Sequence, residues 1–317
     1  MPNWGRYCYV FPVDNALLRK NYQSFKLWIT QNPLILLIFR VEDEVQLLQK
    51  AANEHVVQTF GRIRWSNYMG IIMEYLPGGS LRRIISKRTV PLTPSVILRM
   101  IYDIAAGLAY MHNLPEKVCM VHGDIKPENV LLTKEFRCKL ANFGSARMVA
   151  MASTPTTEAP TRKDPGMTLA YAAPEKLKNP NLKIKEQDTL SFGIVLHALL
   201  ARQTSNTTFQ VVYLVSVKKS NRPDTCKIHE FRNSLNFNGK QIITSLELIM
   251  TQCCHQDPEQ RPTMVEVRDH LLEILNDQDT ADVLNEVTGA LKQLSINVID
   301  PKKHQCLPLS QLRLATG

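Results

Sequence analysis

The residues best suited to chemistry lie in one short stretch, residues 122–132, which reads His-Gly-Asp-Ile-Lys-Pro-Glu-Asn-Val-Leu-Leu. It brings together the carboxylate of Asp124, the cation of Lys126 and the amide of Asn129. The apolar residues at its end predict a short buried strand. A polar loop that ends in a buried strand holds reactive groups at the edge of a cleft. The alternative is a solvated loop that carries these residue types by chance.

The same stretch resembles the catalytic loop of protein kinases, H-R-D-x-K-x-x-N in its serine/threonine form. The match here is H-G-D-x-K-x-x-N, with Gly123 in place of the usual arginine. The resemblance implies that Asp124 accepts the proton of a substrate hydroxyl and that Lys126 neutralises charge on the transferring phosphate. Asn129 would hold a second Mg²⁺ through its amide oxygen.

A second motif follows at the separation expected of the kinase D-F-G sequence, but it reads Asn142-Phe143-Gly144. In the family, the aspartate at this position is the anionic ligand of the main Mg²⁺. Mg²⁺ is a hard cation that favours charged oxygen ligands, and an amide oxygen has no net charge. We therefore expect weaker Mg²⁺ capture, and loss of comparable electrostatic groups costs roughly 3 kcal/mol or more.

Three further motifs resemble the kinase large lobe. Residues 166–175 resemble G-T-x-x-Y-x-A-P-E, which implies that Thr168 bonds the catalytic aspartate and lysine. Glu175 would form a buried structural ion pair with Arg261. Asp188 begins a D-x-x-S-F-G match and would hold the backbone of the catalytic loop.

Residues 70–81 resemble the strand and hinge that join the two kinase lobes. Met73 would be the gatekeeper beside the adenine pocket, and the backbone that follows would hydrogen-bond adenine. Such sites bind nucleotide largely through backbone groups and apolar walls. The nucleotide-binding residues implied by the resemblance are Met73, Glu74, Tyr75, Leu76, Leu131 and Glu44.

The N-terminal part departs from the family pattern. Strand-like runs cover residues 7–13, 25–30 and 34–39, and residues 41–55 read as a helix. A glycine-rich hairpin is missing, because the only glycine before position 61 is Gly5. The V-A-I-K-type tetrapeptide that carries the family's strand lysine is also missing, although Lys26 lies at a plausible distance before the next helix. Glu44 matches the helix glutamate that pairs with such a lysine. Alternatively, residues 1–40 are a substitute or truncated N-terminus of a family member. The alternative for Glu44 is a solvated acid on the helix surface.

The remaining elements follow from periodicity and turn residues. Apolar strands are expected over residues 56–65 and 68–75, and a long helix over residues 94–112, capped by Thr93 or Ser95. Closing helices are expected over residues 240–277, and an amphipathic helix over residues 281–294. Residues 148–167 read as an activation loop. Because Gly123 replaces the arginine, phosphorylation in that loop is not expected to order it.

The predicted fold class is α+β: a two-lobed protein-kinase-like fold with an incomplete or atypical N-terminal β lobe and a mainly helical C-terminal lobe. We divide the chain into an atypical segment 1–40, a kinase-like domain 41–275 and a C-terminal helix and tail 276–317. Within the domain, the small lobe extends to about residue 76 and the large lobe covers residues 80–275.

Composition narrows the class of protein. The chain of 317 residues is 44% hydrophobic and 21% charged, which is typical of a globular protein. Its seven cysteines form no C-x-x-C pair, which argues against a disulfide framework or zinc site. The start lacks the apolar run of a signal peptide, and the run 34–39 is too short to span a bilayer, so we expect a cytoplasmic protein. The net charge of +9 is scattered, so specific nucleic-acid binding is not expected.

The motifs are similar to the tyrosine-kinase-like group, which includes receptor-interacting and interleukin-receptor-associated kinases. The predicted function is an ATP- and Mg²⁺-dependent serine/threonine kinase, catalytically impaired because of Asn142, the missing glycine-rich loop and the missing strand lysine. The partner would be a protein substrate or signalling partner. One alternative is a pseudokinase that acts as a signalling scaffold or regulator by protein binding, with ATP and Mg²⁺ weak or lost. Another is a truncated product of a longer kinase.

Overall fold

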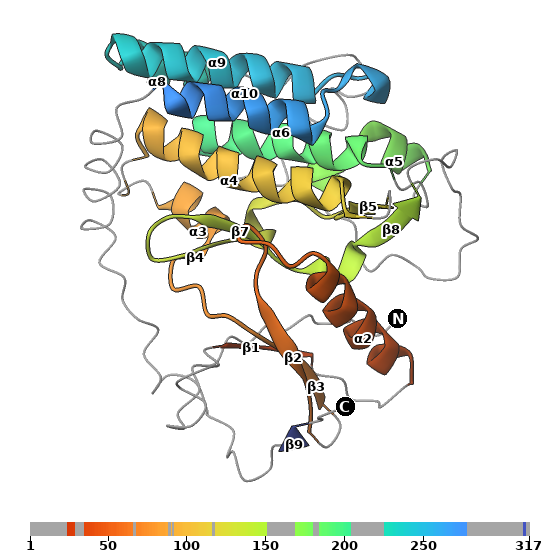
Figure 1. Ribbon diagram of the computed structural model, residues 1–317. Coiled ribbons are helices and arrows are strands. Elements are labelled where there is room, and N and C mark those ends of the chain that lie inside the picture. The colour runs from red at the N-terminus through yellow and green to blue at the C-terminus, as the bar shows by residue number, and fades with distance from the viewer. Residues whose placement is uncertain are drawn as a thin grey trace.

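The structure, a computed structural model, describes residues 24–28, 35–65, 68–87, 90, 92–115, 118–150, 169–179, 184–203, 225–277 and 313–314. Within these ranges a small lobe, built from a sheet and one helix, lies below a larger lobe of stacked helices (Figure 1). This is the predicted two-lobed α+β fold. Among the described residues, none of the helices combines the length and apolar character needed to cross a membrane.

The small lobe contains one antiparallel sheet of strand order β1-β3-β2-β9. Its strands are β1 (Ser24–Trp28), β2 (Thr59–Trp65), β3 (Tyr68–Met73) and β9 (Arg313–Leu314). Lys26 lies opposite Ile71 in the pairing of β1 with β3. The register of β2 shifts between Thr59 and Gly61, where Gly61 has a φ of 137° that favours glycine. The sheet therefore consists of one short hairpin, β2 with β3, and two strands from distant parts of the sequence, β1 and β9.

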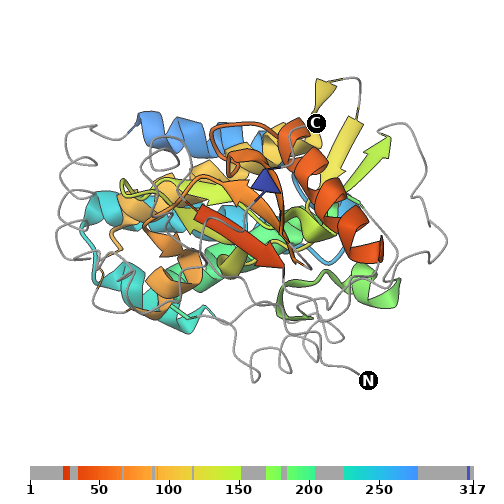
Figure 2. The same ribbon diagram turned by 90° about the horizontal axis from the view of Figure 1, so that it is seen from below.

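The helix α2 (Ile35–Lys50) lies beside this sheet in both views (Figures 1 and 2). The prediction of a strand over residues 34–39 is wrong, because all but the first of these residues form the opening turns of α2. The predicted helix over residues 41–55 also ends earlier, at Lys50. A short, continuous apolar run fits a buried helix as well as a strand. Here the run continues directly into a helical pattern, and extending an existing helix requires no new nucleus.

The large lobe is mainly helical. Its helices are α3 (Leu81–Ser86), α4 (Pro94–His112), α5 (Pro174–Lys178), α6 (Glu186–Leu200), α8 (Cys226–Asn233), α9 (Phe237–Cys253) and α10 (Met264–Asn276). Short strands frame its loops: β4 (Gly79–Ser80), β6 (Val130–Leu132) and β7 (Cys138–Leu140) in one sheet, and β5 (Val118–Val121) with β8 (Arg147–Ala150) in another. Two of these strands, β5 and β6, lead into and out of the loop that carries Asp124.

The helix α4 is the centre of this lobe and has the predicted bounds. Thr93 caps it, since its hydroxyl oxygen accepts a hydrogen bond from the Val96 N–H at 3.3 Å, and Pro94 occupies the first turn, where no donor is lost. Nearly every residue of α4 is buried. The helices α6 and α10 lie alongside it (Figure 1). The loops that follow α4 are therefore held by a buried helix.

Candidate active site

The loop between β5 and β6 holds Asp124 in a fixed orientation. The Lys126 Nζ lies 2.8 Å from Oδ2 and 3.0 Å from Oδ1 of Asp124, and the side chains of both residues are largely buried. The short helix η2 (Pro127–Asn129) then turns the chain, so that Asn129 comes back to the same carboxylate. The Asn129 Nδ2 donates to the Asp124 backbone oxygen at 2.7 Å and to Oδ2 at 2.9 Å. One carboxylate is thus shared by a cation and an amide.

Asn142 joins this cluster from the other side. It precedes the short helix η3 (Phe143–Ser145) and has a left-handed backbone, with φ 68° and ψ 70°. Asparagine adopts this conformation more readily than most residues. Its side-chain Nδ2 donates to Oδ1 of Asn129 at 3.0 Å. The two residues predicted as metal ligands are therefore joined to each other by a hydrogen bond.

His122 links the Asp124 loop to the segment that leads into Asn142. Its Nδ1 lies 3.3 Å from the backbone N–H of Asp124, and its Nε2 lies 3.1 Å from the backbone oxygen of Ala141. Burial lowers the pKa of His122, although Asp188 and Asp124 oppose that change. The neutral ring thus accepts at Nδ1 and donates from Nε2. Its edge also packs on Phe143, at 5.1 Å between ring centroids.

Asp188, in the first turn of α6, holds the backbone of the Asp124 loop. Its carboxylate accepts from the N–H groups of His122 at 2.7 Å and Gly123 at 2.9 Å, and it lies 3.0 Å from Nε2 of His112. Burial by itself raises the pKa of Asp188, but the hydrogen bond and charge of His112, with His122 and Gly123, hold it below its ordinary value. The contribution of His112 was not predicted, because its position at the end of α4 reveals no partner.

Three of the residues predicted to bind nucleotide take part in a small apolar cluster. Val57, Leu76 and Ala141 are buried together, and Met73 and Leu131 pack against them. Val57 and Ala141 were not singled out from the sequence. Ala141 could have been, because it directly precedes the Asn142 motif. The cluster brings together the hinge, the strand after the Asp124 loop, and the loop that carries Asn142.

Glu74 and Tyr75, the polar hinge residues, have different surroundings. The Glu74 Oε1 accepts from the Lys139 Nζ and from the Gln58 N–H, both at 2.7 Å. This side chain therefore ties the hinge to β7. Tyr75 is half-buried, and burial raises the pKa of its hydroxyl although Arg83 opposes that change. The backbone of both residues remains the part predicted to face a nucleotide.

Glu44 is buried, with a relative exposure of 2%. The interpretation of Glu44 as a solvated helix acid is therefore wrong. A Cβ atom added to Gly144 would lie 3.6 Å from Oε2 of Glu44 and 3.8 Å from Oδ1 of Asn142. The helix α2 thus directs this carboxylate toward the Asn142 loop. Lys26 lies in β1, the strand before α2 and next to β3, which is the place in the chain predicted for a strand lysine.

Glu175 and Arg261 form the expected pair. The Arg261 Nη1 and Nη2 donate to the two carboxylate oxygens of Glu175 at 2.6 and 3.0 Å. Arg261 also donates to the backbone oxygens of His255 at 2.8 Å and Glu186 at 2.9 Å, and its side chain is fully buried. This arrangement connects α5, α6 and the segment before α10. Thr168, the other residue predicted from this motif, lies outside the described residues, as do the predicted strand 7–13, the tail helix 281–294 and most of the loop 148–167.

The side chains of this cluster do not fit Mg²⁺ well. The Asn129 Oδ1 already accepts a hydrogen bond from Asn142, and both amides are neutral. The carboxylate of Asp124 is paired with Lys126. In the part of the chain that the structure describes, no group of three or more His, Cys, Asp and Glu side chains is arranged to hold a metal ion. A hard divalent cation would find little anionic oxygen here.

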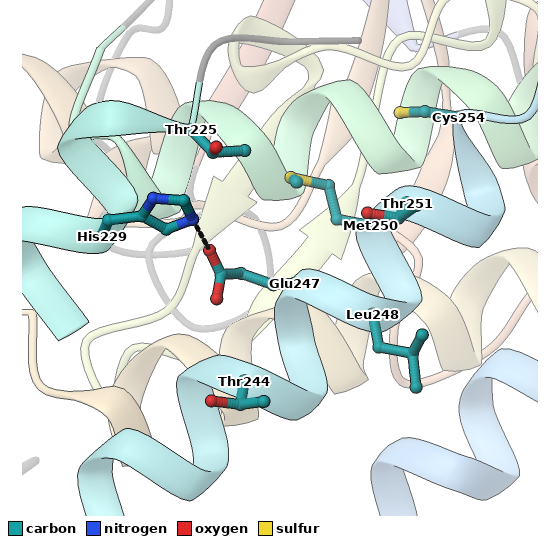
Figure 3. Close-up of a pocket in the computed structure, with 8 residues that line it drawn as sticks. All are labelled: Thr225, His229, Thr244, Glu247, Leu248, Met250, Thr251 and Cys254. Carbon is teal, nitrogen blue, oxygen red and sulfur yellow. Dashed lines mark ion pairs between the residues drawn. The ribbon is translucent and has the colours of Figure 1, made fainter.

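A separate pocket of about 390 Å³ lies between α8 and α9 (Figure 3). His229 and Glu247 point toward one another there, with Nε2 and Oε1 3.3 Å apart. Cys254 also lines it, and burial raises the pKa of this thiol to about 12, so the thiol is protonated near neutral pH. None of the residues that line this pocket belongs to the Asp124 loop. The cluster around Asp124 is therefore the better candidate for chemistry.

The chain is similar to several proteins that are named serine/threonine-protein kinases. Receptor-interacting serine/threonine-protein kinase 1 of Homo sapiens is 28% identical over 278 residues, which cover 84% of this chain and 39% of that protein. Receptor-interacting serine/threonine-protein kinase 2 of Bos taurus is 26% identical, over 84% of this chain and 50% of that protein. Serine/threonine-protein kinase 12 of Arabidopsis thaliana is 28% identical, over 75% of this chain and 48% of that protein. The chain thus spans half or less of the length of these relatives.

The sequence profile of the protein kinase domain matches residues 35–272. These residues include α2, the hinge, the Asp124 loop, Asn142 and the helices up to α10. The predicted likeness to serine/threonine kinases of the receptor-interacting type is confirmed by the relatives. The chain belongs to the protein kinase domain family.

Proposed function

We propose that the chain is an ATP-dependent serine/threonine protein kinase whose phosphoryl transfer is impaired. Asp124 would accept the proton of the substrate hydroxyl, and the contacts from Lys126 and Asn129 support this role because they fix its carboxylate. Lys126 would offset charge on the transferring phosphate. The residues around Val57 and Leu76 would hold the adenine. Family members generally use ATP and Mg²⁺.

The observation that carries this proposal is the hydrogen bond from Asn142 to Asn129. Phosphoryl transfer depends almost entirely on positioning and on charge stabilisation. The positioning groups are present, but a neutral amide stands where the family has an anionic ligand. Losing one such electrostatic group costs about 3 kcal/mol, which corresponds to a rate roughly 100-fold lower.

The second candidate is a pseudokinase that acts by binding a signalling partner. The frame of the large lobe supports it, because the contacts of Asp188 and of Arg261 with Glu175 hold the fold without any need for catalysis. The folded kinase domain would then bind its partner whether or not the site transfers phosphate. The partner in either case would be a protein, and the expected location is cytoplasmic.

The test is phosphate transfer from labelled Mg-ATP by the purified chain, to itself and to a generic serine/threonine substrate. The Asp124→Asn variant is assayed beside it. Asp269→Asn serves as the matched control, since it makes the same change at an exposed position on α10. Slow transfer that disappears in Asp124→Asn and persists in Asp269→Asn supports the kinase. Absence of transfer in all three, from folded samples, refutes the kinase and favours the pseudokinase.

A further inference from the structure

The orientation of the two amides at the centre of the site is set by their partners. The Asn129 Nδ2 donates to two oxygens of Asp124, at 2.7 and 2.9 Å, and these oxygens can only accept. The Asn129 Oδ1 must therefore face the other way, toward Asn142. Asn142 in turn must present its NH₂ group to that oxygen, at 3.0 Å. Only this arrangement pairs a donor with an acceptor at each of these contacts.

The hydrogen bond takes one of the two lone pairs of the Asn129 oxygen that a cation would need, and it points an N–H group at that oxygen. A carboxylate at position 142 could not donate to Oδ1 of Asn129, because an ionised carboxylate is only an acceptor. Two oxygens facing each other would repel, and a divalent cation between them would relieve that repulsion. With Asn142, the N–H group meets the oxygen directly. Asparagine instead of aspartate at position 142 thus gives a direct hydrogen bond to Asn129, where a metal ion would otherwise bridge the two side chains.

The carboxylates of Asp124 and Glu44 do not supply a metal site either. Asp124 is in an ion pair with Lys126, and its side chain has a relative exposure of only 9%. Glu44 directs Oε2 toward Gly144 and is also buried. Neither group forms part of a metal-binding cluster among the residues that the structure describes. The site therefore holds its shape through hydrogen bonds and one ion pair.

We propose that this chain binds adenine nucleotide without a divalent cation, because the Asn142–Asn129 hydrogen bond takes the place of the metal bridge. This inference rests on the proposed function in one respect, that the site accepts ATP. The ligand is the metal-free nucleotide, held through its base by the hinge and the apolar cluster and through its phosphates by basic groups such as Lys126. Mg²⁺ then adds nothing to affinity.

The test measures the Kd of ATP by titration calorimetry on the full chain, once with excess Mg²⁺ and once with excess EDTA. We expect the two values to agree within about threefold, which is less than about 1 kcal/mol. In Asn142→Asp, the new carboxylate should make binding at least about tenfold tighter with Mg²⁺ than with EDTA. Asn142→Ala removes the hydrogen bond without adding charge, so its two values should again agree.

A second measurement replaces Mg²⁺ with Mn²⁺. The electron paramagnetic resonance signal of free Mn²⁺ is the readout, in the presence of ATP. The unaltered chain with ATP should remove no more Mn²⁺ than ATP does by itself, whereas Asn142→Asp should remove more. Thermal unfolding without nucleotide checks that both variants fold. Loss of ATP binding in EDTA, or absence of binding in both conditions, overturns the inference. Loss of binding in EDTA alone leaves phosphate transfer from Mg-ATP standing. Absence of binding in both conditions refutes the proposed function as well, so the two failures are distinguishable.

Discussion

At the scale of single residues, the backbone conformation at position 123 favours glycine over the arginine that is usual in the family. Its φ is +75°, a left-handed conformation that glycine adopts without strain. A Cβ atom there would lie 3.1 Å from the backbone oxygen of Ser145, which is a tight contact with an atom that moves little. The position thus permits close approach of the catalytic loop to the Asn142 loop.

We predict that Gly123→Ala lowers the free energy of unfolding by about 1 to 3 kcal/mol, because alanine is strained at this φ. Urea denaturation followed by circular dichroism measures the change. Gly144→Ala is the control, since its Cβ would meet its nearest atom at 3.6 Å and its φ is not in the left-handed region. Equal stability of Gly123→Ala and the unaltered chain would contradict the strain argument.

How far the sequence predicts this site depends on the residue. Asp124, Lys126 and Asn129 lie within six positions, so a short loop necessarily brings them close, and a motif of fixed spacing reveals them. The bond from Asn142 to Asn129 was not predicted, because it depends on two loops meeting with amides in one orientation. Val57 was missed for a similar reason, since one valine of an apolar run carries no signal of a binding wall.

At the scale of elements, the pair of Arg261 and Glu175 joins segments that are far apart in the chain. Five hydrogen-bond contacts converge on one buried guanidinium, two to Glu175 and three to backbone oxygens. A lysine could not reproduce this planar arrangement of donors. The motif predicted the pair, but the additional bonds to the backbone come from turns that the sequence does not specify.

We predict that Arg261→Ala destabilises the chain by about 3 kcal/mol or more, because it leaves the carboxylate of Glu175 largely buried and without its partner. Arg261→Lys should recover less than half of that loss. Thermal and urea unfolding measure both variants. As a comparison, Arg268→Ala removes an exposed ion pair with Asp269 and should cost less than about 1 kcal/mol. Similar costs for Arg261→Ala and Arg268→Ala would refute the buried network.

The predicted bounds of α4 are confirmed, whereas the strand predicted over residues 34–39 is wrong. The helix α4 has its predicted bounds because nineteen residues repeat one apolar pattern between a threonine cap and Asn113. The run 34–39 is too short to distinguish a strand from a helix, and its neighbours decided the outcome. The division of the chain at residue 40 stays a prediction, and α2 passes through that point.

At the scale of the whole molecule, buried histidines link stability to pH. Burial lowers the pKa of both His55 and His122 from the ordinary 6.5, despite the opposing charges of Asp103 and Asp188. The unfolded chain therefore takes up more protons than the folded chain below that pH. Stability is fully present above pH 6.5 and is lost as the pH falls toward the lower folded-state values. Asp188, with its lowered pKa, adds a loss in the same direction at more acid pH.

We predict a lower urea midpoint at pH 5.5 than at pH 7.5, with an unchanged slope of the transition. His55→Gln should reduce that difference, since the variant has one fewer buried group to protonate. His229→Gln, at a half-exposed position, should leave the difference unaltered. A midpoint that is constant or rises on acidification would contradict the neutral state of these rings.

The effect of Asn142 on catalysis is measured by the rate of phosphate transfer by Asn142→Asp relative to the unaltered chain, at saturating Mg-ATP. We predict a rate about 100-fold higher, because the variant restores an anionic ligand. The double variant Asn142→Asp, Asp124→Asn should lose that gain, and Asn238→Asp, the same change at an exposed position in α9, should show none. A rate that stays the same in Asn142→Asp, from folded protein, would contradict the claim that Asn142 limits catalysis.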